Sequence, residues 1–416
     1  MPQQELQNEN IVTAHDVCCI EGKLEDDSKN LADQCDVHLN RDYETQDRNH
    51  APITPRRTAA LDAMTLHELL TGQLDCRSVA EVIDAILATP TVCMQTNGIS
   101  HGRPSTADEA EKVQPASDDH ENRANDKHIA AILCPRTNVE RLDIARAYKS
   151  LYDEDLTAML KQKLIGEFRQ LIQALMETPT SFDAHQLHQA VNSHSMLTGL
   201  CTKSSTLIEI LCTRSSDEIR LIEKEYRQMF GTYLENDISK VTWHHLMHLF
   251  MWLCAGVREE STSIDHQKAH EDAKLLCAAD EAHFARDSTL FAFILSTQGV
   301  AQLRAVFNEY QHIAGVDIEK VVEREFIGDF REALTTIIMT VQNRLPTFYA
   351  HRIHKALHGI SSHNSSLIRL IVTRSDIDIA AIRNEYERIY HETLEQDITA
   401  YCSGVFREGL QLVARC

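Results

Sequence analysis

Hydrophobic residues recur with a helical period over most of this 416-residue chain, and the pattern itself repeats. Four amphipathic segments carry a tyrosine at the same place, with separations of 78, 84 and 76 residues: Tyr148, Tyr226, Tyr310 and Tyr386. A second marker lies upstream of each tyrosine with the same three separations: Arg136, Arg214, Gln298 and Arg374. Two markers in one register predict four copies of one structural unit.

Each unit is predicted to contain about five short helices. In the second unit, apolar residues at helical spacing place the helices near residues 183–193, 205–213, 216–229, 233–239 and 243–254. Ser216, Asp217 and Glu218 supply a cap and early acidic residues for the third helix. The chain holds only 14 glycines and 9 prolines, which favours helices over sheets. We therefore predict an all-α fold in which the units bury apolar faces internally and against their neighbours.

Two polar segments break this pattern. Residues 1–60 contain 12 acidic and 6 basic side chains and few apolar ones, so we predict a disordered acidic tail. Residues 91–126 are also polar and irregular, and they are predicted to form a long insertion in the first unit.

Composition excludes several classes of function. Lys and Arg total 41 against 62 Asp and Glu, a net charge of −21, which argues against nucleic-acid binding. The first residues lack the pattern of a signal peptide, and no segment has the roughly 18 apolar residues of a membrane span. We expect a cytoplasmic protein with reduced cysteines. The segment Gly98-Ile-Ser100-His-Gly102 lacks the strand–turn–helix context of a nucleophile elbow, and no nucleotide-binding loop is present, so we predict no enzyme.

The four units resemble annexin repeats over roughly residues 75–416. The segment from Leu367 to Tyr386, with Val-Thr-Arg374-Ser at its centre, is similar to a fourth annexin repeat, and Leu207–Arg220 to a second. The resemblance divides the chain, after the tail, into repeats at 75–177, 178–260, 261–344 and 345–416. It implies a curved disc whose convex face carries loops that bind calcium and anionic phospholipid.

The resemblance also implies where calcium binds. In annexins, a glycine-containing loop between the first two helices of a repeat offers carbonyl oxygens, and an acid about forty residues downstream completes the site. This chain departs from the pattern in every repeat. The position of the downstream acid holds Lys163, Val241 and Tyr401 in repeats one, two and four, and only repeat three keeps a carboxylate, Glu325.

We therefore expect one low-affinity calcium site, formed in repeat three by Glu325 with carbonyls of Glu281, His283 and Ala285. Alternatively, Glu325 is an ordinary solvated acid, because the loop of repeat three has lost both glycines. The loops at Leu197 and Gly199 and at Leu357 and Gly359 either hold calcium loosely or are plain turns between helices.

Candidate membrane contacts lie on the same loops. Phe284 stands where the family places an exposed Trp, so it inserts into the bilayer or else packs against neighbouring loops. Lys163, Lys203 and Arg286 either meet anionic headgroups or are ordinary exposed bases.

The chain has 22 histidines, and several fall on or beside the predicted loops: His194, His244, His245, His283, His358 and His363. Their protonation at mildly acidic pH offers an acid-triggered switch of the convex face, unless they are simply exposed or buried and neutral. The pairs His185/His188 and His351/His354 recur in repeats two and four, but no third ligand is apparent, so we expect no metal there.

Two functions remain. The first is calcium-dependent peripheral binding to anionic phospholipid, which the surviving Glu325 and Phe284 favour. The second is a calcium-independent interaction scaffold, which three lost carboxylates favour, with the tail and insertion recruiting a protein partner. Divergent protist annexins, the alpha-giardins, make a cytoskeletal partner one option, and the family resemblance leaves non-classical export open. We favour the first function.

Overall fold

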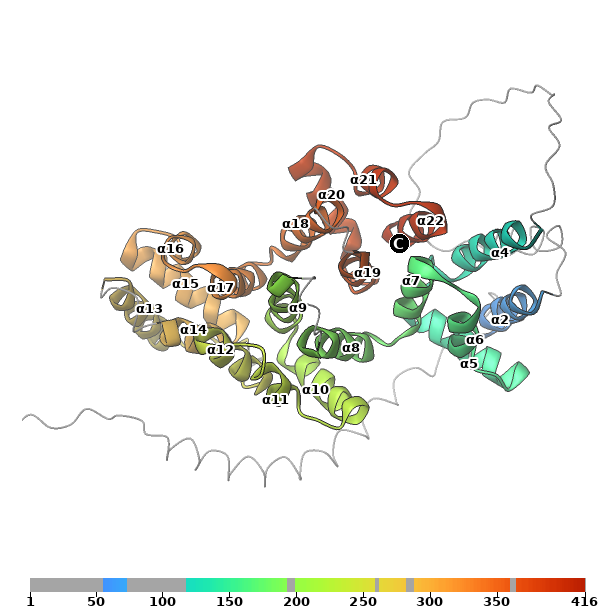
Figure 1. The fold of residues 1–416 in the computed structure, drawn as a ribbon. Helices are drawn as coiled ribbons and strands as arrows, with labels where there is room; N and C mark the ends of the chain where they lie inside the picture. Colours follow the sequence, from blue (N-terminus) through green and yellow to red (C-terminus); the bar gives the residue numbers. More distant parts are fainter. Residues whose placement is uncertain are drawn as a thin grey trace, which may run out of the picture. The chain divides into compact units, whose positions relative to one another are not determined.

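Helices are the only regular elements in the computed structural model, which describes residues 55–72, 117–192, 199–258, 262–281, 288–359 and 364–415. Twenty helices lie in these ranges, and no strand does (Figure 1). They form four repeats of five helices, whose positions we name A to E. The described residues belong to one unit, which spans Pro55–Cys416.

The first repeat consists of α2 (Pro55–Thr71), α4 (Ser117–Leu133), α5 (Asn138–Tyr152), α6 (Leu156–Lys163) and α7 (Gly166–Met176). The second consists of α8 (Pro179–Asn192), α9 (Gly199–Thr213), α10 (Ser216–Phe230), α11 (Leu234–Ile238) and α12 (His244–Cys254). The third consists of α13 (His266–Glu281), α14 (Ser288–Thr297), α15 (Val300–Ala314), α16 (Ile318–Glu325) and α17 (Gly328–Val341). The fourth consists of α18 (Leu345–His358), α19 (Asn364–Val372), α20 (Ile379–Tyr390), α21 (Leu394–Tyr401) and α22 (Gly404–Ala414).

The arginine markers join helix A of a repeat to its B–C junction. Arg214 forms an ion pair with Asp183 of α8 at 2.8 Å, and both side chains are buried. Arg136 forms the same pair with Asp62 of α2 at 2.9 Å. In both repeats the ion pair lies in a buried or mostly buried place. A charged group that loses its contact with water is costly unless it is paired, and each arginine and aspartate therefore compensates the other. Arg374 instead pairs with Asp378 and lies over the ring of Tyr349.

The tyrosine markers lie in the core. All four are fully buried and pack in two hydrophobic clusters, one formed by repeats one and four and the other by repeats two and three. Repeat four is tied to repeat two by the buried pair of Arg369 with Glu209 at 2.9 Å. Helical periodicity places these apolar residues on one stripe of each helix, and burial of that stripe accounts for the tyrosine marker.

Two predicted boundaries differ from the observed helices. The sequence predicts a tail up to residue 60 and a first repeat from residue 75, but helix A of repeat one begins at Pro55. It also predicts an insertion over 91–126, but α4 begins at Ser117. Residues 72–116 separate helices A and B of this repeat, so a search for neighbouring helices along the chain does not join α2 to the rest of the repeat. The remainder of the predicted tail and insertion lies outside the described residues.

Candidate membrane-binding site

The D–E junctions of the four repeats have one local design. A buried anchor lies between helices D and E in each repeat: Leu164, Thr242, Phe326 or Cys402. It directly follows helix D in repeats one, three and four, and in repeat two it lies four residues beyond Ile238, the last residue of α11. The residue after the anchor has an extended backbone and precedes helix E, at the position that usually holds a capping Ser, Thr, Asp or Asn. In the first three repeats this position holds Ile165, Trp243 and Ile327, whose side chains make no cap hydrogen bond.

These three apolar side chains project into solvent. Ile165 is 75% exposed, Trp243 72% and Ile327 83%. Each has a basic residue two or three positions before it: Lys163, Lys240 and Arg324. An exposed apolar tip beside a flexible basic side chain is the pattern that suits the boundary between lipid headgroups and acyl chains. Repeat four differs, because Ser403 occupies the position.

The opposite end of helix E lies at the B–C junction. Arg220, in the second turn of α10, donates a hydrogen bond to the carbonyl of Gly256, just beyond the C-terminal end of α12. In repeat one, Asn138 at the start of α5 donates to the carbonyl of Glu177, just beyond α7. An eleven-residue helix is about 16 Å long, so D–E and B–C junctions lie at opposite ends of their repeats.

The first residue of helix E adopts a left-handed backbone in all four repeats. Gly166, Gly328 and Gly404 have φ values of 63°, 63° and 61°, but repeat two places His244 there, with φ 50°. A residue with a Cβ is strained in this conformation, by about 1 kcal/mol.

We therefore expect His244→Gly to raise the free energy of unfolding by about 1 kcal/mol, because glycine relieves the strain. Urea unfolding at pH 7.5 measures the change. Gly328→Ala in repeat three, which introduces the same strain, is expected to lower stability by a similar amount. An unchanged or less stable His244→Gly chain would contradict the strain argument.

The positions of the downstream calcium acid lie directly before these junctions. Lys163, Glu325 and Tyr401 are the last residues of their D helices, and Val241 follows α11. Among these four positions only Glu325 offers a carboxylate, and its side chain forms an ion pair with Arg324. A carboxylate at this position is a ligand that suits calcium, and Glu325 would have to release Arg324 to offer it.

Other predicted ligands are placed only in part. Gly199 begins α9, Glu281 ends α13, Leu357 is buried in α18, and Gly359 follows that helix with an extended backbone. Lys203 lies within α9. The remaining predicted residues lie outside the described residues: Leu197, His283, Phe284, Ala285, Arg286, His194 and His363, and also the segment Gly98–Gly102.

The described histidines have different surroundings. His244 and His245 open α12 directly after Trp243. Partial burial lowers the pKa of His245, and the nearby His248 and His244 lower it further. His245 therefore becomes charged only below the usual pH range of histidine. His358 lies against Asp397 of α21 at 2.9 Å. His185 and His188 have different polar partners, Glu177 and Tyr226.

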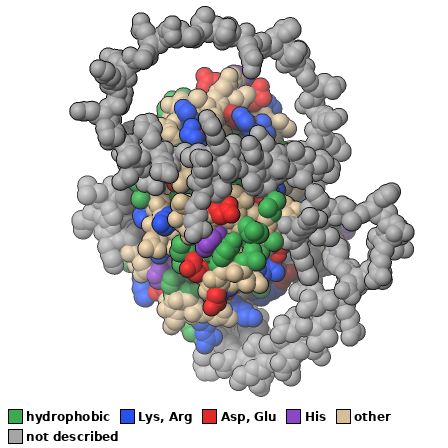
Figure 2. Space-filling model, turned by 90° about the vertical axis from the view of Figure 1, so that its right-hand side faces the viewer, with side chains coloured by type: hydrophobic (Ala, Val, Ile, Leu, Met, Phe, Trp, Pro, Cys, Tyr) green, Lys and Arg blue, Asp and Glu red, His purple; other side chains and the backbone are tan. Residues whose placement is uncertain are grey.

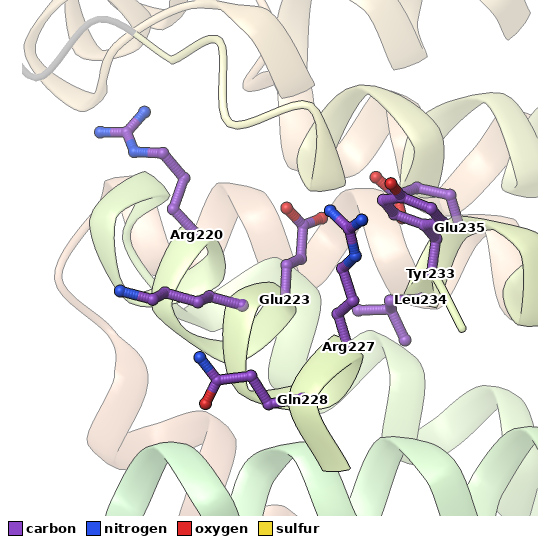
Figure 3. Close-up of a pocket in the computed structure, with 8 residues that line it drawn as sticks. Arg220, Glu223, Arg227, Gln228, Tyr233, Leu234 and Glu235 are labelled. Atoms are coloured by element: carbon purple, nitrogen blue, oxygen red, sulfur yellow. The ribbon is translucent and has the colours of Figure 1, made fainter. Parts of the chain in front are cut away.

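A cleft of about 600 Å³ lies between α10 and α11, lined by charged side chains (Figure 3). Glu223 and Arg227 point to the same side of α10, and the guanidinium of Arg227 lies over the ring of Tyr233 at 4.4 Å. The Oε1 atom of Glu223 is buried without a hydrogen-bond partner. Burial, together with the nearby carboxylate of Glu235, raises the pKa of Glu223 to about 8.

Comparison with known proteins identifies the family. The Annexin family model matches four segments of the chain, at residues 118–175, 182–253, 271–337 and 348–413. The chain belongs to the annexin family. It is 37% identical to human annexin A11 and 38% identical to human annexin A7 over 286 residues. These matches cover 69% of this chain and 55% and 57% of the two relatives, so the chain spans about half their length.

Solved annexins share the fold. The structure of an annexin A8 mutant with an intact N-terminus aligns with a TM-score of 0.67 and 28% sequence identity, over 89% of this chain and 97% of that chain. Annexin III aligns with a TM-score of 0.65 and 33% identity, over 70% of this chain and 88% of that chain. The four matched segments agree with the four repeats of the structure. The annexin family is known for calcium-dependent binding to phospholipid.

No helix among the described residues is long and apolar enough to span a bilayer. On the face shown in Figure 2, basic and acidic side chains are interspersed and hydrophobic side chains gather in small clusters.

Proposed function

We propose that this annexin binds anionic phospholipid membranes peripherally through its D–E junctions. The observation that carries the proposal is the set of three exposed apolar tips at one repeated position, Ile165, Trp243 and Ile327. Single apolar side chains on separate repeats suit a laterally continuous apolar medium such as a bilayer. A protein partner instead favours one contiguous patch.

Calcium contributes through repeat three in this proposal. Glu325 is the carboxylate that remains at the downstream-acid positions, and the predicted loop residues Glu281, His283 and Ala285 would supply carbonyl oxygens. One carboxylate gives a low affinity, since calcium prefers roughly 6–8 oxygen ligands. Phe284 and Arg286 belong to the same predicted loop and would follow it into the headgroup region. In this proposal the protein acts from the cytoplasm, without enzymatic activity, and its acidic tail would recruit a protein partner.

The test is cosedimentation with phosphatidylserine vesicles, with millimolar calcium or with chelator, at pH 7.4 and pH 5.5. We expect Glu325→Gln to raise the calcium concentration for half-maximal binding at least about tenfold, because the substitution removes the charged ligand. Glu323→Gln is the matched control, since Glu323 is an exposed acid on the same helix, and it should leave the calcium requirement unchanged.

The other outcomes discriminate between the alternatives. Equal calcium requirements for Glu325→Gln and the unmodified chain would exclude the repeat-three site. Binding confined to pH 5.5 and insensitive to chelator would favour the acid-triggered switch, with the histidines that follow Trp243 as its first candidates. The absence of binding in all four conditions would exclude the membrane function and favour the interaction scaffold.

A further inference from the structure

Two histidines near the C-terminal end of α18 and an aspartate of α21 lie close together in repeat four. The ligand-capable atoms of His354, His358 and Asp397 all lie within 4.8 Å of one another. Asp397 is buried, His354 half-buried and His358 more exposed, so the cluster reaches from the core to solvent. The two histidines are four residues apart, which places both rings on one face of the helix.

Aromatic rings pack against both imidazoles. The ring of His354 stacks on Tyr390 at 3.7 Å and on His358 at 4.0 Å. The ring of His358 lies 4.3 Å from Tyr401, the residue that replaces the calcium-binding acid of this repeat. The cluster therefore lies beside the position where the family's calcium carboxylate is lost.

Repeat two shows what this cluster replaces. There, Asp237 is buried like Asp397 and likewise accepts a hydrogen bond from the marker tyrosine. Lys240 compensates its charge, with its Nζ atom 2.7 Å from the carboxylate. Asn192 stands where repeat four has His358, so repeat two combines one histidine with a lysine.

Repeat four has no such lysine. Ala400 occupies the position of Lys240. The described partners of Asp397 are His358, Tyr386 and the carboxyl group of Glu392, and none of them is Lys or Arg. A buried carboxylate is stable when it is paired with a cation or coordinates a metal. The substitution of the lysine thus coincides with the gain of a second imidazole.

We propose that His354, His358 and Asp397 form a binding site for a divalent transition-metal ion of the zinc class. Two imidazole nitrogens and one carboxylate oxygen are a ligand set of zinc sites that keep an open position, which water or Glu392 fills here. Ligand atoms on zinc are about 3.3 Å apart, so the present separations close by small side-chain rotations. Tyr386, hydrogen-bonded to Asp397, orients the carboxylate.

This ligand set distinguishes the site from a calcium loop. Calcium takes oxygen ligands almost exclusively, whereas imidazole favours zinc and its neighbours. Repeat four would thereby carry a metal site of a different chemical class from the one predicted in repeat three. The proposal is independent of membrane binding, because it rests on three side chains within one repeat.

The experiment is a zinc titration of the chelator-treated full chain in competition with a chromophoric chelator, with cobalt(II) as a spectroscopic probe. We expect a zinc site whose cobalt form shows the intense visible absorption of tetrahedral coordination. His358→Asn, which copies Asn192 of repeat two, should lose this absorption and weaken zinc binding by about 10–100-fold. His351→Asn is the control, because His351 bonds Tyr390 and lies outside the cluster, and it should bind like the unmodified chain.

A gain of binding tests the same geometry in repeat two. The double substitution Asn192→His and Lys240→Ala gives that repeat the ligand set of repeat four, and it should add a second equivalent of zinc. Thermal unfolding of each chain without metal shows whether it is folded. Equal zinc affinity and an equal cobalt spectrum for the unmodified and His358→Asn chains would overturn the proposal. A cobalt spectrum typical of octahedral coordination would overturn it as well.

Discussion

Replacing the three apolar tips by serine, in the combined variant Ile165→Ser, Trp243→Ser and Ile327→Ser, is expected to weaken vesicle binding about 100-fold. Each side chain is mostly exposed in the free protein and loses water contact on insertion. If partial burial contributes about 1 kcal/mol for each side chain, the three together contribute about 3 kcal/mol, or about two orders of magnitude in affinity. Cosedimentation over a series of phosphatidylserine concentrations measures the change.

The same chain supplies a matched control for this variant. Val139, Leu221 and Ile377 are 64%, 56% and 65% exposed, and they lie at B–C junctions, at the opposite ends of the repeats. Their combined replacement by serine removes comparable apolar surface but should leave vesicle affinity unchanged. If both triple variants bind equally, general surface hydrophobicity rather than the D–E junctions governs attachment.

Stability is expected to change little in the first variant. Ser403 occupies this position in repeat four and makes no cap hydrogen bond, so serine at the other three positions should add no cap. The three replaced side chains are mostly exposed, and the core therefore stays intact. The triple variant should unfold at about the same urea concentration as the unmodified chain. Lost binding with unchanged stability separates a functional effect from misfolding, which would lower both.

Most of the fold can be predicted from the sequence alone because its markers are core residues. Tyr226 recurs at fixed separations because every repeat buries a tyrosine at this place. Arg214 and Arg136 recur because each pairs with an aspartate of helix A. The predicted helices of repeat two match α8 to α12 except at their starts, where α8 and α9 begin several residues earlier. Helix starts are poorly marked when the first turn is polar, and that explains the difference.

Helix A of repeat one escapes the local pattern although a signal exists. Asp62-Ala63 with Leu66-His67 has the same spacing as Asp183-Ala184 with Leu187-His188 in α8. The structure shows why both pairs recur, since each aspartate meets an arginine marker and each histidine meets a marker tyrosine. A search for that short motif would have placed the first repeat from residue 55.

The candidate sites are harder to predict for a physical reason. The sequence shows the loss of the calcium acid at Tyr401. It does not show that Ile165, Trp243 and Ile327 are exposed, because their exposure depends on how helices D and E meet. His354 and His358 are visible as a pair four residues apart, yet Asp397 lies 39 residues beyond His358 and reaches it only through packing of α18 on α21. Comparison of repeats two and four, with Asn192 against His358, would have indicated the difference.

Glu223→Gln is expected to stabilise the protein by about 2 kcal/mol at pH 8. The pKa of Glu223 is raised to about 8 in the folded chain, from 4.5 for an ordinary glutamate, because the carboxyl group is buried near Glu235. The folded state therefore holds a proton that the unfolded state releases above pH 4.5, and this glutamate costs stability as the pH rises from 4.5 to 8. The full shift from 4.5 to about 8 corresponds to an upper limit of about 5 kcal/mol, at about 1.36 kcal/mol for each pKa unit. Solvent access to the carboxyl group reduces this value.

Urea unfolding between pH 5 and pH 8.5 measures both the gain and its pH dependence. The benefit of Glu223→Gln should shrink toward pH 5, where the folded and unfolded states of the unmodified chain both approach the protonated form. Glu387→Gln, at an exposed position of α20, is the control and should change stability little at any pH. A benefit that is the same at every pH would show that packing, and not the charge, is responsible.

Repeat four indicates why the substitution should succeed. Arg383 occupies the position of Glu223 there and forms an ion pair with Glu395, the counterpart of Glu235, at 2.5 Å. Repeat two thus places two acids where repeat four places a pair of opposite charges. Glu223→Arg should rebuild that pair with Glu235 and stabilise the chain at pH 8 at least as much as Glu223→Gln. If arginine stabilises less than glutamine does, the cost of burying the guanidinium exceeds the gain from its ion pair with Glu235, and the analogy with repeat four fails.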